Sequence, residues 1–312
     1  MDMFKGPLSP AGRTVLVTGA GSGIGRATSL HLAQRGFEVY AGVLNQREYD
    51  ACAASPPAET AAAERLNLVI MDVTSPPSLQ AAAKLVHEGC GGELWGVINC
   101  AGVSCSFGPV EHVPVDKVKL NFEVNCIGVI NVLQAFLPQL RAAEGRVVNV
   151  SSYCGFAPFP FYCAYNMSKF AVEGLTETLR LELRAVAPRM RVVLLQPGNI
   201  YPTDMNGPKS GAHFNNSMAP FAAAMRPVYG TIDAVKIFTS NEENMKKVHP
   251  AVIAAALERA LTSRRPPMTM SVPSDIFLVR LLKGLLPDWA WTVFHYGLIK
   301  GLWKAGCSVF AA

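Results

Sequence analysis

The sequence has little charge and no cluster of basic residues. Of its 312 residues only 16% are charged, and the 28 lysines and arginines exceed the 23 acidic residues by just five. Half of the chain is hydrophobic, which excludes a disordered protein. A mildly basic chain without a basic run gives no support for nucleic-acid binding. The composition therefore predicts a folded protein with a large core and no nucleic-acid partner.

Patterns typical of metal binding and of secretion are also missing. The eight cysteines include no C-x-x-C pair and show no zinc-type spacing with the six histidines, so we predict free thiols and no metal site. The N-terminal residues lack an apolar core of signal-peptide length, and no uncharged apolar run reaches 18 residues. These absences predict an intracellular, cytoplasmic protein without a membrane-spanning helix.

A strand, a glycine-rich turn and a helix are predicted close to the N-terminus. Residues 13–17 form a β-branched run, the sequence T-G-A-G-S-G-I-G follows at residues 18–25, and a helix extends to about residue 35. Glycines let the backbone approach a pyrophosphate, and the free N–H groups at a helix start favour its charge. A bare glycine turn is the alternative, and the flanking elements argue against it. The predicted cofactor residues here are Thr18, Gly19, Ser22, Gly23, Ile24 and Gly25.

Strands and helices continue to alternate up to about residue 200. Further strands are predicted at residues 37–44, 66–71, 96–99, 145–151 and 191–195, and a long helix is predicted at residues 115–140. This alternation predicts an α/β fold, a Rossmann-type doubly wound parallel sheet with helices on both faces. We predict a tail at residues 1–12, one domain at 13–267 with a substrate lid at 201–250, and a C-terminal helical extension at 268–312.

Three side chains that can handle protons, Ser152, Tyr165 and Lys169, fall within eighteen residues. Tyr165 and Lys169 are four residues apart at the start of a predicted helix, so both project from one face. The ammonium is expected to lower the pKa of the phenol, which could then exchange a proton with an alcohol. The alternative is a solvated helix face without a catalytic role.

These motifs together resemble the short-chain dehydrogenases/reductases. The glycine turn, Tyr-x-x-x-Lys, a serine thirteen residues before the tyrosine and a Pro-Gly loop occur in that family's order. The resemblance implies that Ser152 orients the substrate oxygen, Tyr165 exchanges its proton and Lys169 also holds the nicotinamide ribose. It further implies that Asn125 holds a water that connects Lys169 to solvent. Satisfying local backbone groups or a helix bulge is the alternative role for Asn125.

The resemblance also implies cofactor contacts at the ends of later strands. Asp72 would bind the adenine amino group with help from the backbone of Val73, although Asp72 could instead belong to a turn or a helix cap. The family's second asparagine before the Ala-Gly pair is Cys100 here, and its usual threonine after the Pro-Gly loop is displaced. The further implied cofactor residues are Asn99, Ala101, Gly102, Pro197, Gly198, Ile200 and Thr203.

The residues at the end of the second strand do not decide between NAD and NADP. An acidic residue there would favour NAD and an arginine would favour NADP, but Val43 and Leu44 are neutral and Arg47 lies close by. We expect NAD to be slightly favoured, because the chain resembles the branch that contains retinol, hydroxysteroid and D-3-hydroxybutyrate dehydrogenases.

The predicted activity is the NAD(P)-dependent interconversion of a primary or secondary alcohol and its carbonyl, with a lipophilic substrate such as a steroid or retinoid. A small hydroxy acid is the alternative, because Lys209, Arg226 and Lys236 in the predicted lid could clamp a carboxylate. A non-catalytic dinucleotide-binding sensor is the alternative outside the enzyme class. The resemblance also implies a homo-oligomer.

The C-terminal tail combines apolar residues at helical spacing with basic residues and tryptophans. The pattern predicts an amphipathic helix whose basic side carries Arg280 and Lys283. One interpretation is a helix packed over the substrate crevice. The other is peripheral contact of residues 275–304 with an organelle membrane, in which lysines face anionic lipid.

Overall fold

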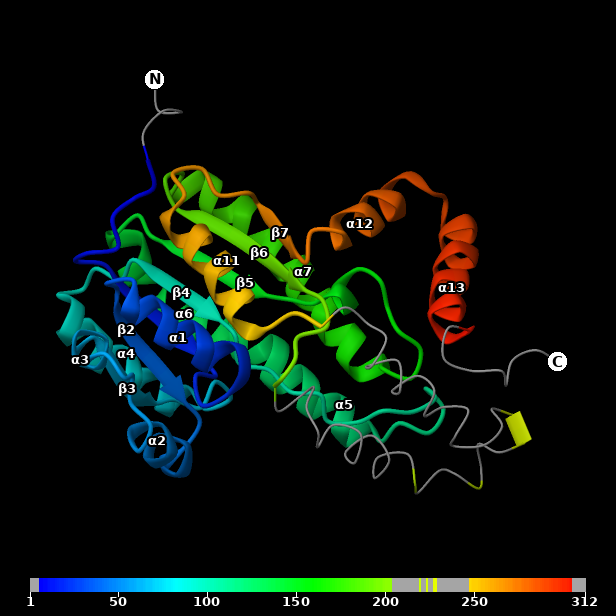
Figure 1. The fold of residues 1–312 in the computed structure, drawn as a ribbon, viewed down its shortest axis with the longest axis horizontal. Coiled ribbons are helices and arrows are strands. Elements are labelled where there is room, and N and C mark those ends of the chain that lie inside the picture. The colour runs from blue at the N-terminus through cyan, green and yellow to red at the C-terminus, as the bar shows by residue number, and fades with distance from the viewer. Residues whose placement is uncertain (1–5, 204–218, 220–222, 224–226, 229–246, 305–312) are drawn as a thin grey trace.

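A parallel seven-stranded sheet forms the centre of the protein (Figure 1). The computed structural model describes residues 6–203, 219, 223, 227–228 and 247–304. The strands lie in the order β3-β2-β1-β4-β5-β6-β7, and all six neighbouring pairs are parallel. Their bounds are β1 (Thr14–Thr18), β2 (Glu38–Val43), β3 (Leu66–Ile70), β4 (Gly96–Asn99), β5 (Arg146–Val150), β6 (Arg191–Pro197) and β7 (Thr269–Val272). The predicted α/β doubly wound fold is confirmed.

Helices cover both faces of the sheet because successive strand residues point to opposite sides. Val15 and Val17 of β1 belong to the core that includes α1 (Gly23–Gln34) and α11 (Pro250–Thr262), whereas Leu16 between them packs in the opposite core. That second core contains α4 (Pro76–Cys90), α6 (Gly128–Ala142) and α7 (Cys163–Val186). Short helices α2 (Gln46–Ala53) and α3 (Thr60–Glu64) follow β2.

The helix predicted at residues 115–140 is divided by a π-helical turn. It consists of α5 (Val115–Phe122), the turn η1 (Glu123–Ile127) and α6. Within the described part of the chain, Val115–Ala142 is the one segment long and apolar enough to cross a membrane, with 28 residues and a mean hydropathy of 1.4. Its inner side chains, including Val132 and Phe136, are buried in the core beside α4 and β4. Core packing therefore accounts for its apolar composition.

The sequence analysis missed β7, which pairs with β6 over four residues. The strand lies beyond residue 267, so the sheet continues past the point where the extension was expected to begin. Helices α12 (Ile276–Leu285) and α13 (Asp288–Lys304) follow it. Most of the predicted lid, and with it Lys209, Arg226 and Lys236, lies outside the described residues.

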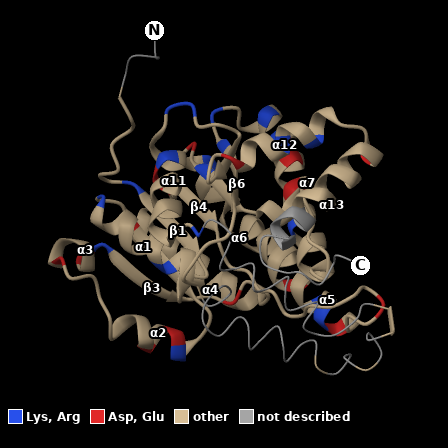
Figure 2. Cartoon of the chain, turned by 45° about the vertical axis from the view of Figure 1, so that its right-hand side comes forward, with Lys and Arg blue, Asp and Glu red and all other residues tan. Residues whose placement is uncertain are grey.

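The basic side chains of α12 point into the protein, which corrects the orientation predicted for this helix. Arg280 lies 3.7 Å from the carboxylate of Glu173, and the Lys283 ammonium donates to the backbone carbonyl of Phe156. The apolar side chains face outward instead, as Phe277 (60% exposed) and Leu285 (70% exposed) show. Arg280 and Lys283 are the only basic residues of α12 (Figure 2), so its outer face is apolar.

Ion pairs join α1 to α11, two helices that are far apart in the sequence and adjacent on the sheet (Figure 1). Glu258 accepts from His31 Nε2 at 2.7 Å and from Arg35 Nε at 2.8 Å. Burial raises the pKa of Glu258, but the two hydrogen bonds and the nearby charges outweigh burial and lower it overall.

Replacing Glu258 by glutamine should lower the free energy of unfolding at pH 7 by about 1 kcal/mol, because charged hydrogen bonds are lost but Arg35 is largely exposed. A carboxyl group whose pKa is depressed on folding stabilises above its ordinary pKa of 4.5 and loses that contribution as the pH falls below it. Urea unfolding should therefore show wild type and Glu258→Gln converging in stability below that pH. Glu182→Gln, an exposed change on α7, is the control that should have no effect.

Candidate functional site

A cavity of about 310 Å³ opens at the carboxyl ends of the strands. Because the strands are parallel, their carboxyl ends all reach the same edge of the sheet, which is where α/β proteins bind ligands. Most of the predicted site residues line this cavity: Gly19, Ser22, Gly23, Ile24, Gly25, Asp72, Val73, Ala101, Gly102, Ser152, Tyr165, Lys169, Pro197, Gly198, Ile200 and Thr203.

The glycine turn between β1 and α1 is tight and leaves room for an anion. Gly19 and Gly23 adopt left-handed backbone conformations with φ of +65° and +53°. A Cβ atom on Gly25 would lie 2.2 Å from the carbonyl oxygen of Gly19, so only glycine fits there. The turn leads into the start of α1, whose first N–H groups have no partner within the helix. These features fit the pyrophosphate of a dinucleotide.

Two residues predicted to bind cofactor lie behind the cavity wall and support it. The Thr18 hydroxyl accepts from the backbone N–H groups of Cys100 (3.0 Å) and Ala101 (2.9 Å), which fixes the loop after β4 against β1. The Asn99 side chain donates to Asn149 Oδ1 at 2.8 Å and is buried. Neither of them is among the residues that line the cavity.

Asn125 lies in the π-helical turn and, like Thr18 and Asn99, supports the cavity wall without lining the cavity. Its side chain is 1% exposed, accepts from the N–H of Val103 at 2.8 Å and donates to the carbonyl of Val103 and to Ser168 Oγ, both at 2.9 Å. It therefore ties the loop after β4 to α7. Asn125 does lie in a helix bulge, one of the alternatives for this residue, but its hydrogen-bond partners are distant in the sequence and are not local backbone groups. The water relay to Lys169 stays a prediction.

The three proton-handling residues come together where β5 ends and α7 begins. Ser152 follows β5 in an extended conformation and accepts from the N–H of Cys154 at 3.2 Å. Tyr165 lies in the first turn of α7, and Lys169 follows one turn later. The Lys169 ammonium donates to the Val150 carbonyl at 3.0 Å and lies 5.6 Å from the centre of the Tyr165 ring. The predicted constellation is thus present in space.

The direction of the pKa shift at Tyr165 is opposite to the sequence prediction. Burial raises the pKa of the Tyr165 phenol well above its ordinary value, and a hydrogen bond with Ser152 opposes this only in part. Burial also lowers the pKa of Lys169. The prediction considered the charge of the ammonium and omitted desolvation, which is the largest cause of the shift. At neutral pH the proton therefore stays on Tyr165, which suits protonation of a carbonyl oxygen.

Glu48 is a lining residue that the sequence analysis overlooked. Its carboxylate accepts from the N–H of Leu44 at 2.9 Å, and Asn45 caps α2 by accepting from the N–H of Glu48 at 3.0 Å. A Cβ atom on Gly21 would lie 2.3 Å from Glu48 Oε2, so the carboxylate lies directly against the glycine turn. The spacing of Asn45 and Glu48 is that of a capping box, and this signal could have identified the residue. Arg47 does not line the cavity.

Asp72 has the turn role that the sequence offered as an alternative, and it also lines the cavity. Its Oδ1 atom accepts from the N–H of Thr74 at 2.9 Å and from the Thr74 hydroxyl at 2.8 Å, so it stabilises the turn before α4. The same residue lines the cavity, beside Met71 and Val73. A contact with adenine remains a prediction.

An aromatic cluster joins the segment between Ser152 and Tyr165 to α13. The Tyr153 ring lies 5.2 Å from Phe156 and 5.4 Å from Phe159, measured between ring centres. On α13, Trp291 stacks on His295 at 4.8 Å, and the Tyr153 hydroxyl lies 3.4 Å from His295 Nε2. Burial raises the pKa of Tyr153 and lowers that of His295. The catalytic segment is therefore bordered by a partly buried aromatic cluster.

Comparison with known proteins agrees with this geometry. Residues 13–212 match the model of the short chain dehydrogenase family. Retinol dehydrogenase 16 of Rattus norvegicus is 30% identical over 90% of this chain and 87% of its own length. The 17-beta-hydroxysteroid dehydrogenase type 6 of Bos taurus is 32% identical over 81% of this chain and 78% of its own. The mitochondrial D-beta-hydroxybutyrate dehydrogenase of Rattus norvegicus is 35% identical over 61% of this chain and 54% of its own.

The fold is also similar to that of solved structures. The 3-ketoacyl-(acyl-carrier-protein) reductase from Brucella melitensis, solved with NADH, superposes with a TM-score of 0.66 at 20% identity and covers 85% of this chain and 98% of its own. The resemblance seen in the sequence motifs is thus confirmed across most of the chain. The protein belongs to the short-chain dehydrogenase family and is an NAD(P)-dependent oxidoreductase that acts on CH–OH groups.

Proposed function

We propose that the protein interconverts a lipophilic alcohol and its carbonyl, with a substrate of the size and polarity of a retinoid or steroid. The supporting observation is the aromatic cluster of Tyr153, Phe156, Phe159 and Trp291 beside the segment that carries Ser152 and Tyr165. None of these four residues lines the described cavity, but apolar and aromatic surroundings with few polar groups favour apolar ligands. The names of the retinol and hydroxysteroid relatives point to the same class.

In this reaction the residues of the site would have the following roles. Ser152 orients the substrate oxygen, and Tyr165 donates its proton to that oxygen during reduction or removes the proton during oxidation. The Lys169 ammonium, fixed by the Val150 carbonyl, stabilises negative charge on Tyr165 when the proton leaves. The nicotinamide, when bound, supplies or accepts the hydride. The glycine turn and Asp72 would hold the adenosine half.

A small hydroxy acid is the second candidate substrate, and the D-beta-hydroxybutyrate dehydrogenase relative favours it. A carboxylate substrate requires a cationic clamp. A panel containing retinol, a hydroxysteroid and 3-hydroxybutyrate, assayed by absorbance of the reduced cofactor, separates the two classes. Turnover of 3-hydroxybutyrate with a kcat/KM above that of both lipophilic alcohols would overturn the proposed substrate class.

Tyr165→Phe should lower kcat by about 10²–10⁴-fold, because the ring still packs but the transferable proton is gone. Binding of the dinucleotide, followed by fluorescence titration, should stay nearly unchanged, whereas Lys169→Ala should impair both binding and turnover.

Since burial raises the pKa of Tyr165, alcohol oxidation by the wild type should rise with pH by about tenfold per unit between pH 7 and 9. Retention of more than about a tenth of wild-type kcat in Tyr165→Phe would contradict the assignment.

We further propose that the enzyme prefers NAD, because the Glu48 carboxylate lies against the glycine turn and the end of β2, and an additional phosphate on an adenosine ribose bound beside it would meet a like charge. Glu48→Gln keeps an acceptor for the N–H of Leu44 and removes the charge. The ratio of kcat/KM for NADP to that for NAD should rise about tenfold in this variant, which corresponds to about 1.4 kcal/mol. Arg47→Ala is the control, and a loss of NADP use in that variant instead would assign the ribose site to Arg47.

We also propose that the extension makes peripheral contact with a phospholipid surface, in a homo-oligomer located in the cytoplasm or on an organelle membrane. Several exposed side chains on the described parts of α12 and α13 are apolar, among them Phe277, Leu285 and Trp289, of which Trp289 is 74% exposed. An exposed apolar face of this kind, with aromatic residues, is typical of helices that lie in a membrane interface. The basic residues of α12 face inward, so this helix presents an apolar and uncharged surface to lipid.

The protein should therefore co-sediment with neutral phosphatidylcholine vesicles, and raising the salt concentration should not release it. Leu278→Asp combined with Trp289→Asp should leave the protein in the supernatant, because two charges would have to enter the interface. Leu181→Asp is the matched control, since Leu181 is 73% exposed on α7 and should not affect sedimentation. Equal recovery of wild type and the double variant in the supernatant would contradict the proposal.

A further inference from the structure

Glu173 is a largely buried carboxylate, one helical turn beyond Lys169 on α7, to which the catalytic scheme gives no role. Its side chain is 13% exposed. Oε1 accepts from Ser151 Oγ at 3.1 Å and from Gln196 Nε2 at 2.7 Å. Ser151 and Gln196 are almost completely buried and directly precede Ser152 and the Pro-Gly loop, respectively. The Glu173 carboxylate thus fixes the residue that precedes Ser152 and the residue that precedes the Pro-Gly loop.

The same carboxylate also lies against the turn that begins at Ser152. A Cβ atom on Gly155 would lie 2.5 Å from Glu173 Oε1 and 2.3 Å from Ser151 Oγ, so the turn η2 (Tyr153–Gly155) rests directly on this pair. Gln196 extends the network by accepting from Ser271 Oγ of β7 at 3.1 Å. The Glu173 carboxylate therefore joins α7 to β6 and to the residue after β5, and Gln196 connects this network to β7.

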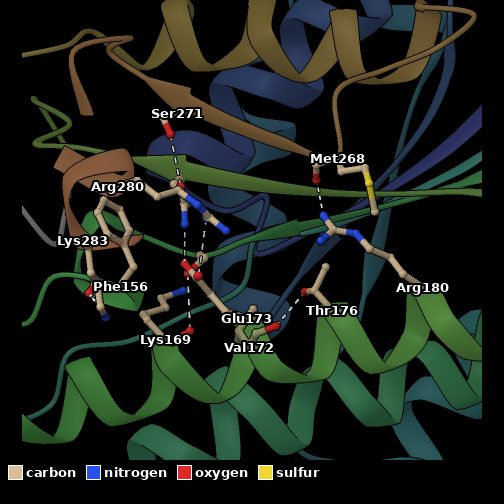
Figure 3. Close-up of polar contacts among 12 residues, drawn as sticks. Phe156, Lys169, Val172, Glu173, Thr176, Arg180, Met268, Ser271, Arg280 and Lys283 are labelled. Atoms are coloured by element: carbon tan, nitrogen blue, oxygen red, sulfur yellow. Dashed lines mark hydrogen bonds and ion pairs between the residues drawn. The ribbon is translucent and has the colours of Figure 1, made fainter. Parts of the chain in front are cut away.

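Helix α12 supplies the positive charge that faces this carboxylate (Figure 3). Arg280 Nη1 lies 3.7 Å from Glu173 Oε2, a distance at which the two interact as charges. One turn later Lys283 donates to the Phe156 carbonyl and lies 4.8 Å from the centre of the Phe170 ring. Burial raises the pKa of Glu173, while the hydrogen bond from Gln196 and the charge of Arg280 favour its ionised form.

We propose that Glu173 is a positioning residue through which docking of α12 aligns Ser152 and Lys169. When Arg280 is in place, the ionised carboxylate accepts from Ser151 and Gln196 and supports the turn below Ser152. When Arg280 is removed, this largely buried carboxylate loses the nearest of the positive charges that face it and keeps only those of Lys283 and Arg180, so its ionised form and its hydrogen bonds weaken. The extension is in this way part of the active-site framework. The inference rests on membership of the dehydrogenase family and is independent of the substrate class.

The experiment compares Glu173→Gln, Arg280→Leu and the double variant, with Glu182→Gln as the matched control on the exposed side of α7. Glu173→Gln should lower kcat about tenfold for the best alcohol of the panel and leave the KM for NAD within about threefold, since one charged interaction behind the site is lost. In this variant Arg280, whose side chain is 30% exposed, loses the carboxylate that faces it. The double variant should therefore recover part of the lost kcat.

The pH profile distinguishes positioning from a general effect on stability. Glu173 must be ionised to accept the hydrogen bonds from Ser151 and Gln196. Because its pKa is raised above the ordinary 4.5, kcat of the wild type should fall as the pH is lowered towards the raised pKa of Glu173. This acid limb should disappear in Glu173→Gln, because the glutamine does not titrate. An unchanged acid limb in Glu173→Gln would overturn the proposal.

Hydrogen exchange gives a readout that needs no substrate. The backbone amides of residues 151–157 should exchange faster in Glu173→Gln and in Arg280→Leu than in the wild type, and should be unchanged in Glu182→Gln. Arg280→Leu changes a side chain on a peripheral helix, so it keeps the test valid should Glu173→Gln fail to fold. Unchanged exchange over residues 151–157 in Arg280→Leu would overturn the coupling, whatever substrate the panel identifies.

Discussion

The active site depends on one buried cation and the carbonyl that holds it. Lys169 is 6% exposed, and its ammonium donates to the Val150 carbonyl at the end of β5. This hydrogen bond joins α7 to the central sheet at the point where Ser152 leaves it. Burial of an ammonium without polar partners costs free energy, so the Val150 carbonyl stabilises Lys169 in this position. The placement of Tyr165, one turn earlier on α7, follows from the same constraint.

The walls of the cavity are held by side chains that do not line it. Thr18, Asn99 and Asn125 use their hydrogen bonds to join the loop after β4 to β1, β5 and α7. Removing a partner from such a buried network leaves polar atoms without a hydrogen bond. The resulting loss of folding free energy is larger than the net contribution of the hydrogen bond itself. These residues therefore act on the cofactor site through the backbone that they position.

The C-terminal extension is organised differently from an ordinary amphipathic helix on a protein surface. In α12 the charged residues satisfy a buried carboxylate and a backbone carbonyl, and the apolar residues are left facing outward. On α13, Trp291 and His295 pack inward against the segment that follows Ser152. One structural unit thus borders the catalytic segment on its inner side and presents an apolar surface on its outer side.

The sequence by itself determined the parallel sheet, the glycine turn and the spacing of Ser152, Tyr165 and Lys169, because these depend on local periodicity and on backbone conformations that only glycine adopts. It did not reveal β7, whose four residues pair only with the distant β6. Tertiary structure alone decided the pKa of Tyr165, the inward turn of Arg280 and Lys283, and the burial of Glu173. Each of these depends on desolvation or on a charge from another part of the chain, and neither can be seen in local sequence.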